Sequence, residues 1–430
     1  MVNELFHGLC EDKFVWKAKC KDEFGFNWSP PKLSISYKEC YKRLCQPSVV
    51  LWGDEHHSIL DSSIHECNAI NEENGIYRNP DFDKKLFVGL ALGEVCAWAI
   101  NRKGGLFVWG SVPGNDYSPY QPDSQISFKN AMHLEMGTRI SSIASEAGYS
   151  IAIDMERNVW IIIRPDRPYI IESDLINNEH ADSTPIQVVC SYEYSAILTR
   201  SGEMYIIWPF DEYVTGAYEK RCKGSSTRFK IKGNSISCKT WKLKYDLYKL
   251  PQIGDLPELD QRDRSSESNS PTKIIEIAAM HDALVALTDK GDVLCLTGTE
   301  GYSNLNIPKE DRVMHISARG TRYHVLRNSN FKVPAEHNFS ATIHNTYINS
   351  FNAGCYHAVA LSSCGKVYDY GFNYEHALGR GDLEENEWHE PGEVDFGKGK
   401  FCISVAAGAN QSGALVADLN PIADLNPVTD

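Results

Sequence analysis

The side chains best suited to binding a charged partner are concentrated between residues 220 and 249. This segment holds ten Lys or Arg residues and one Asp, a net charge of +9 in a chain whose formal net charge is −14. Aromatic residues such as Phe229 and Trp241 lie among them. Basic and aromatic side chains together can stack on nucleic-acid bases or bind an acidic protein surface. A third interpretation is a solvated loop packed beside the main fold.

The remainder of the chain carries a net charge of −23. A chain this acidic is not built as a whole to coat nucleic acid or an anionic membrane, so we expect a protein partner rather than nucleic acid. The candidate partner-binding residues of the segment are Lys220, Arg221, Lys223, Arg228, Lys230, Lys232, Lys242 and Lys244.

Catalytic motifs are absent from the sequence. It contains no GxSxG, HExxH or GxxxxGK[ST]. Its thirteen cysteines include no CxxC pair and no cluster with zinc-site spacing. We therefore predict a non-catalytic protein without a metal site or cofactor. The cysteines are expected to be reduced and mostly buried, as is typical of cytosolic or nuclear proteins.

Composition and internal repeats predict the kind of fold that carries these residues. The chain has 430 residues, of which 42% are hydrophobic and 23% charged. No run approaches the ~18 apolar residues of a spanning helix, and the N-terminus lacks the pattern of a secretory signal. We therefore expect no membrane association and a location in the cytoplasm, the nucleus or both.

An internal repeat runs through most of the sequence. Each unit is a run of apolar residues, a small or Gly turn, a second apolar run, a Gly turn and a third run. The central residues of the seven units are Gly93, Ala147, Tyr192, Met280, Gly320, Gly354 and Gly408, a mean spacing of 52 residues. Strands that are apolar on both faces cannot cover themselves and must stack in an array. The period predicts an all-β fold, a seven-bladed β-propeller.

Two features of the repeat bear on closure and on chemistry. The last unit lacks a third strand, and Val49–Gly53 resembles Leu106–Gly110, so we expect both termini to share one blade. The position three residues after each central residue varies freely, which indicates a packing or hydrogen-bonding position rather than a catalytic one. These residues are Cys96, Ser150, Ser195, Ala283, Tyr323, His357 and Gln411.

One repeat resembles a known type. Its pattern consists of Ala353, Gly354, His357, Leu361, Gly365, Val367, Tyr368, Tyr370 and Gly371, followed by His376–Asp382. The pattern resembles the regulator-of-chromosome-condensation repeat. The resemblance implies a propeller over residues 47–417. It also suggests one alternative function, guanine-nucleotide exchange on a Ran-like small GTPase.

Residues 1–46 have helical spacing and resemble the second half of an F-box. The match rests on Leu9, on Glu11-Asp12 and on Trp16-Lys17, and the first half of the box is missing. An F-box followed by such a propeller resembles the fungal SCF-associated factor family. This resemblance implies a substrate adaptor of a cullin ubiquitin ligase, with the Skp adaptor, the cullin and a protein substrate as partners. The candidate adaptor-binding residues are Leu5, Phe6, Leu9 and Trp16.

The domain prediction has three parts: a helical segment at 1–46, a propeller at 47–417 and a tail at 418–430. The spacing of 88 residues between Tyr192 and Met280 predicts an insertion at about 209–272. The second half of the insertion lacks clear strand alternation, and its end is rich in Ser and Asp, which is typical of a linker. A non-catalytic scaffold is a further alternative to the adaptor and the exchange factor.

Overall fold

The structure is a computed structural model of the 430-residue chain. The residues that it describes are 12–24, 35–53, 68–71, 74–114, 125–146, 148–222, 229–251, 272–297, 302–304, 313–327, 330–332, 347–381, 383–384 and 386–420.

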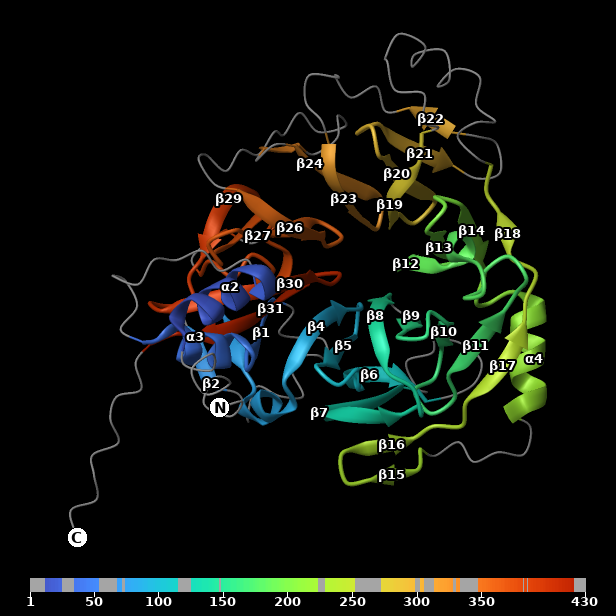
Figure 1. Ribbon diagram of the computed structural model, residues 1–430, viewed down its shortest axis with the longest axis horizontal. Helices are drawn as coiled ribbons and strands as arrows, with labels where there is room; N and C mark the ends of the chain where they lie inside the picture. Colours follow the sequence, from blue (N-terminus) through green and yellow to red (C-terminus); the bar gives the residue numbers. More distant parts are fainter. Residues whose placement is uncertain are drawn as a thin grey trace, which may run out of the picture.

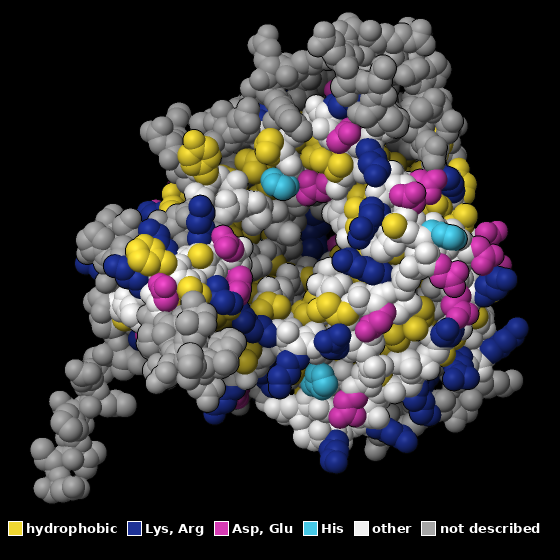
Figure 2. Space-filling model, in the orientation of Figure 1, with side chains coloured by type: hydrophobic (Ala, Val, Ile, Leu, Met, Phe, Trp, Pro, Cys, Tyr) yellow, Lys and Arg dark blue, Asp and Glu magenta, His cyan; other side chains and the backbone are white. Residues whose placement is uncertain are grey.

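The described strands form seven sheets that follow one another around a central channel (Figure 1). The channel is visible as an opening in the space-filling view (Figure 2). Each sheet begins with an inner strand beside the channel. These inner strands are β4 (Phe87–Leu92), β8 (Ile140–Ser145), β12 (Pro185–Cys190), β19 (Ile274–Ala279), β23 (Val313–Arg319), β26 (Ile348–Ala353) and β30 (Lys400–Ala407).

The second strand of each sheet lies antiparallel to the inner strand and contributes most to the core. These strands are β5 (Cys96–Asn101), β9 (Ser150–Asp154), β13 (Ser195–Thr199), β20 (Ala283–Thr288), β24 (Arg322–Arg327), β27 (His357–Ser362) and β31 (Gln411–Asp418). Every residue of β9, β13, β20 and β27 is buried. Their sequences do not alternate because both faces of each strand pack against neighbouring sheets.

The third and outer strands complete the sheets. The third strands are β6 (Leu106–Pro113), β10 (Val159–Ile162), β14 (Met204–Ile207), β21 (Val293–Thr297), β25 (Asn330–Lys332) and β28 (Val367–Phe372). The outer strands are β7 (Gln125–Glu135), β11 (Tyr169–Glu172), β18 (Tyr248–Lys249), β22 (Tyr302–Asn304) and β29 (Trp388–Val394).

The predicted closure of the ring is confirmed. Strand β1 (Ser48–Gly53) pairs antiparallel with β31, from Ser48 opposite Val416 to Gly53 opposite Gln411. Strands β3 (Ile76–Arg78) and β2 (Asn68–Asn71) extend the same sheet outward. Both ends of the chain therefore contribute to one sheet, and β1 covers the edge of β31 that would otherwise be open.

The prediction of an all-β propeller is confirmed, but the prediction of seven complete blades is wrong for the described residues. Six sheets contain four or more strands, and the sheet formed by β23, β24 and β25 contains three. Strand β25 is only 3 residues long, so it offers few backbone groups with which a fourth strand could pair.

A short helical segment precedes the propeller, as predicted. Helices α2 (Lys13–Phe24) and α3 (Tyr37–Leu44) pack on the closing sheet. Cys20, Cys40 and Leu44 are buried there against Phe401 and Leu419. Among the described helices none is both long and apolar enough to cross a membrane.

The insertion folds along the outside of the propeller, and the expectation that its second half lacks strands is wrong for residues 241–249. After α4 (Glu212–Cys222) come β15 (Ile231–Lys232), β16 (Ser235–Ser237) and β17 (Trp241–Lys244). Strand β16 pairs with β7, β17 pairs with β11, and β18 pairs with β14. The insertion thus covers the outer edges of three successive sheets (Figure 1).

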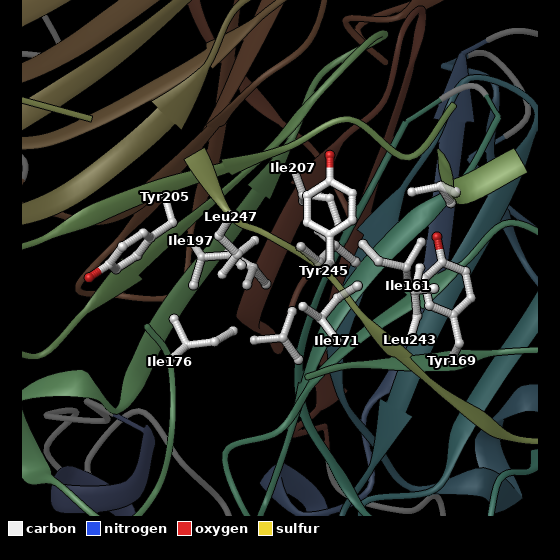
Figure 3. Packing of buried hydrophobic residues seen from close by; sticks show 14 of the residues in the cluster. Ile161, Tyr169, Ile171, Ile176, Ile197, Tyr205, Ile207, Leu243, Tyr245 and Leu247 are labelled. Carbon is white, nitrogen blue, oxygen red and sulfur yellow. The ribbon is translucent and has the colours of Figure 1, made fainter. Parts of the chain in front are cut away.

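The return strand of the insertion belongs to the core. Leu243, Tyr245 and Leu247 are buried in the cluster that also contains Ile171 and Ile197 (Figure 3). Exposed residues alternate with them, so one face of this segment packs inward and the other faces solvent. Residues 252–271, where the linker was predicted, lie outside the described residues.

Candidate functional site: the channel and its two faces

The turns between the inner and second strands form one face of the propeller, here called the turn face. In each turn a backbone N–H bonds to a carbonyl three residues on, as in Gly93 to Cys96 (2.8 Å), Gly354 to His357 (2.8 Å) and Gly408 to Gln411 (2.7 Å). A glycine is required at 354, because a Cβ there would lie 2.3 Å from the His357 ring. The side chain three residues after the start of each turn is thereby aimed at the neighbouring sheet.

Those side chains link successive sheets. The hydroxyl of Tyr149 donates to the carbonyl of Tyr194 (2.6 Å), and the hydroxyl of Tyr194 donates to the carbonyl of Ala283 (2.6 Å). Farther round the ring, His357 Nε2 lies 2.8 Å from the Ser412 hydroxyl. Gln411 Nε2 donates to the carbonyl of Gly93 across the closing interface (2.8 Å).

The predicted hydrogen-bonding role of this position is confirmed, but three of its residues were misassigned by one. Tyr149 and Tyr194 occupy it rather than Ser150 and Ser195, because the turns begin at Glu146 and Ser191. In the three-stranded sheet it is held by Arg322, not Tyr323, since the pairing places Tyr323 opposite Ala318. The guanidinium of Arg322 stacks over Tyr356, 5.5 Å from the ring centre.

A buried ion pair lies at the channel end of the turn face. Arg319, the last residue of β23, places Nη2 3.0 Å from Oε2 of Glu146. Its Nη1 donates to the carbonyls of Leu92 (2.8 Å) and Ala407 (3.2 Å). Arg319 therefore spans the channel and joins its sheet to three others.

The pKa values of Glu146 and Arg319 reflect both their burial and their pairing with each other. Burial raises the pKa of Glu146, and the adjacent Arg319 guanidinium opposes that rise. Burial would lower the pKa of Arg319, but Glu146 and neighbouring thiols keep that pKa above its usual value. Each charge offsets the free-energy cost of burying the other.

Two cavities adjoin the pair. One, of about 270 Å³, is the channel lined by the inner strands, and the other, of about 340 Å³, opens on the turn face. Tyr192, His281 and Tyr356 line the second cavity and are 37–44% exposed. Glu94 and Asp282 add negative charge to the same face. Exposed aromatic side chains beside a cavity are typical anchors for a protein partner.

The thiols near the turn face have little nucleophilic character. Burial raises the pKa of Cys190 and of Cys355, and it raises that of Cys96 to about 11. A thiol with a raised pKa is protonated near neutral pH and reacts slowly. The face is therefore suited to binding rather than to thiol chemistry.

The opposite face carries α2 and α3 and has charged residues of both signs in its turns. Its turns join the second and third strands, and Arg102 lies over the Phe24 ring of α2 at 5.7 Å. Lys and Arg side chains lie near the channel opening together with Asp, Glu and hydrophobic side chains (Figure 2). The basic residues at these turns and at the adjoining starts of inner strands include Arg102, Lys103, Arg139, Arg157, Arg200 and Lys273.

The predicted adaptor-binding residues are largely outside the described part. Leu5, Phe6 and Leu9 lie outside the described residues. Trp16 is on α2, half-buried, with its ring 5.2 Å from that of Tyr41 on α3. Where it is described, this segment uses its aromatic residues to join the two helices.

The predicted basic residues of the insertion that are described lie on several elements. Lys220 and Arg221 are exposed at the end of α4, and Lys232 is exposed on β15. Lys242 instead forms an ion pair with Glu172 (2.6 Å). The other candidates are distributed as follows: Lys230 is exposed before β15, Lys244 is exposed on β17, and Lys223 and Arg228 lie outside the described residues.

Sequence reasoning missed the central pair and the tyrosine links. Arg319 had a detectable signal: it is an Arg at the start of its turn, the position that Gly93 and Gly354 hold in two other units. Glu146 had none, because its partner lies 173 residues away and only the ring brings the two together.

Comparisons with known proteins agree with the repeat assignment. Residues 364–415 match the "Regulator of chromosome condensation (RCC1) repeat". Regulator of chromosome condensation from Xenopus laevis is 38% identical over 66 residues, which is 15% of this chain and 15% of that relative. The chain therefore aligns with only a small part of this relative's length.

Solved structures extend the similarity to the whole propeller. Prp20p from Saccharomyces cerevisiae has a TM-score of 0.59 at 14% identity, covering 92% of this chain and 97% of that one. Human WBSCR16 has a TM-score of 0.57 at 15% identity, covering 86% and 99%. At these identities the likeness establishes the fold, an RCC1-like propeller. The resemblance to an F-box and to SCF-associated factors receives no support from these findings.

Proposed function

We propose that this chain is a guanine-nucleotide exchange factor for a Ran-like small GTPase and binds it through the turn face. The observation that carries the proposal is an RCC1-like propeller with exposed tyrosines beside a cavity, on turns held rigid by links between sheets. Prp20p, whose fold is similar, has been described together with its binding to Gsp1p and histones.

The mechanism requires differential binding and no covalent chemistry. A protein that binds the nucleotide-free GTPase more tightly than the loaded one weakens nucleotide binding by the same factor, because coupling between two ligands is reciprocal. Rigid turns favour this role, since little conformational entropy is lost when the complex forms. Tyr192 and Tyr356 are the proposed anchors, and Asp282 adds charge at the same surface.

The test is release of a fluorescent GDP analogue from a purified Ran-like GTPase in the presence of the full chain. We expect acceleration by the wild type and a loss of about tenfold or more in the double variant Tyr192→Ala/Tyr356→Ala, since aromatic anchors commonly contribute 2 kcal/mol or more. Tyr213→Ala, which removes an exposed tyrosine from the insertion, is the control and should retain the wild-type rate.

Failure of the wild-type chain to accelerate release would refute the exchange-factor proposal. The ubiquitin-ligase adaptor stays a prediction, as do its Skp and cullin partners and a cytoplasmic or nuclear location. Co-purification of the tagged chain from its native cell distinguishes the two functions. Recovery of ligase subunits without a GTPase would favour the adaptor.

A further inference from the structure

The insertion creates a pocket that the repeats alone would not form. A cavity of about 660 Å³ lies between the insertion and the loop after β11, here called the rim pocket. Its charged and aromatic lining consists of Asp174, Asp211, Tyr213, Lys244, Tyr245 and Asp246. The elements that carry Tyr213 and Lys244, α4 and β17, lie on the outside of the ring (Figure 1).

Two tyrosine rings are fixed in the wall of the rim pocket. Tyr213 projects from α4 and is 57% exposed, yet its hydroxyl donates to the carbonyl of Lys244 (2.8 Å). Tyr245 is buried, and its hydroxyl donates to Oδ2 of Asp211 (2.7 Å). The ring centres are 6.1 Å apart with planes tilted by 59°. An exposed ring held in place by its own hydroxyl offers a ready π face to a cation.

Carboxylates surround these rings. Oδ1 of Asp211 accepts the N–H of Val214, which caps the start of α4 and fixes the carboxylate beside Tyr245. Asp174 and Asp246 are exposed, and within the described part of the chain neither forms an ion pair. With one lysine and three aspartates the lining is net negative. Its charge is therefore opposite to the one expected from the basic sequence of the insertion.

Carboxylates beside aromatic faces match the chemistry of an organic cation. An ammonium or guanidinium group can receive carboxylate hydrogen bonds while its aliphatic stem contacts a ring. We propose that the rim pocket binds a Lys or Arg side chain from a basic peptide segment of a partner protein. This site is independent of the exchange activity, since none of its residues lies on the turn face.

The experiment measures fluorescence anisotropy of a fluorescein-labelled pentalysine peptide titrated with the full chain. A pentaglutamine peptide with the same label serves as the uncharged control. We expect Tyr213→Ala and Asp246→Asn each to weaken binding about five- to tenfold, the range expected for a cation–π contact or one partly exposed charge. Tyr213→Phe keeps the ring and should bind within about twofold of the wild type.

Two matched variants test whether the site is specific. Asp282→Asn removes the same charge from an 85% exposed residue on the turn face, and Tyr192→Ala removes an exposed ring there. Both should bind pentalysine like the wild type. Equal weakening by Asp282→Asn and Asp246→Asn would show non-specific attraction and overturn the proposal. Displacement of the peptide by Ca²⁺, lost in Asp246→Asn, would assign the pocket to a metal ion and overturn it as well.

Discussion

At the residue scale, side chains near the turn face form hydrogen bonds that link neighbouring sheets, whether or not a partner is bound. His357 and His324 are both fully buried in consecutive sheets, bonded to the hydroxyls of Ser412 and Tyr370 at 2.8 Å. Burial lowers the pKa of His357 to about 4 and that of His324 to about 3. Both rings are therefore neutral in the folded protein near neutral pH.

This burial makes stability sensitive to acid. The unfolded chain binds a proton at each histidine near pH 6.5 and the folded chain does not, so the free energy of unfolding falls as pH drops below that value. Between pH 7 and pH 4, His357 alone should account for a loss of about 3 kcal/mol. Urea unfolding of the wild type and His357→Gln at both pH values measures it. The variant should be less stable at pH 7 but lose about 3 kcal/mol less on acidification.

The exposed His180 provides the control for this prediction. His180→Gln should leave the pH dependence as in the wild type. An unchanged acid slope in His357→Gln would contradict the assignment of that slope to the buried ring.

At the element scale, the short strand that closes the ring contributes more to holding the fold together than its length suggests. Strand β1 is 6 residues long, yet it joins residues near both ends of the chain into one sheet. Its Trp52 is fully buried, with its ring centre 5.6 Å from that of Phe396. The indole also packs on Gly379, where a Cβ would lie 2.5 Å from it. The loop after β28 is thereby held against the closing strand.

Truncation of this indole should destabilise the closure. We expect Trp52→Ala to lower the free energy of unfolding by about 3–5 kcal/mol, the range for removal of a buried large aromatic side chain. Trp208→Ala, at a residue 39% exposed, is the matched control and should cost much less. Chemical denaturation of the three proteins compares them directly. A cost for Trp52→Ala no larger than that of the control would show that β1 contributes little to closure.

At the scale of the whole molecule, Arg319 braces the ring across its channel. It reaches from the three-stranded sheet to the sheets of β4, β8 and β30, so the sheet with the fewest described strands is held from the far side of the channel. The arrangement is favourable only while Glu146 is present, because a buried charge without its partner is costly.

A double-mutant cycle tests the brace. Arg319→Met should cost about 3–5 kcal/mol, because it leaves Glu146 buried without its cation. Adding Glu146→Gln should restore part of that loss, since the remaining side chain is neutral. Thermal and denaturant unfolding of the four proteins give the coupling energy. Strictly additive effects would mean that the two residues do not act as a pair.

The sequence alone was sufficient for the all-β propeller and its closure because that information was local, but not for the number of complete blades or the strands of the insertion. Each hairpin is formed by residues that are close in the sequence. Second strands such as His357–Ser362 do not alternate between apolar and polar residues because both of their faces pack against other sheets. Even closure was readable, since Val49–Gly53 repeats the pattern of a third strand. The RCC1-like repeat followed from the glycines and aromatic residues around Gly354, and residues 364–415 match that repeat.

The tertiary structure alone decided where chemistry can occur, because the relevant residues are distant in sequence. Arg319 meets Glu146, and Tyr213 and Tyr245 meet Asp174, only once the ring and the insertion have folded. Residues 220–249 are rich in Lys and Arg, but strand pairing places this segment along three sheets, and an acidic pocket lies beside it. Local pattern determines which strands form, whereas the sign and shape of a surface depend on which strands become neighbours.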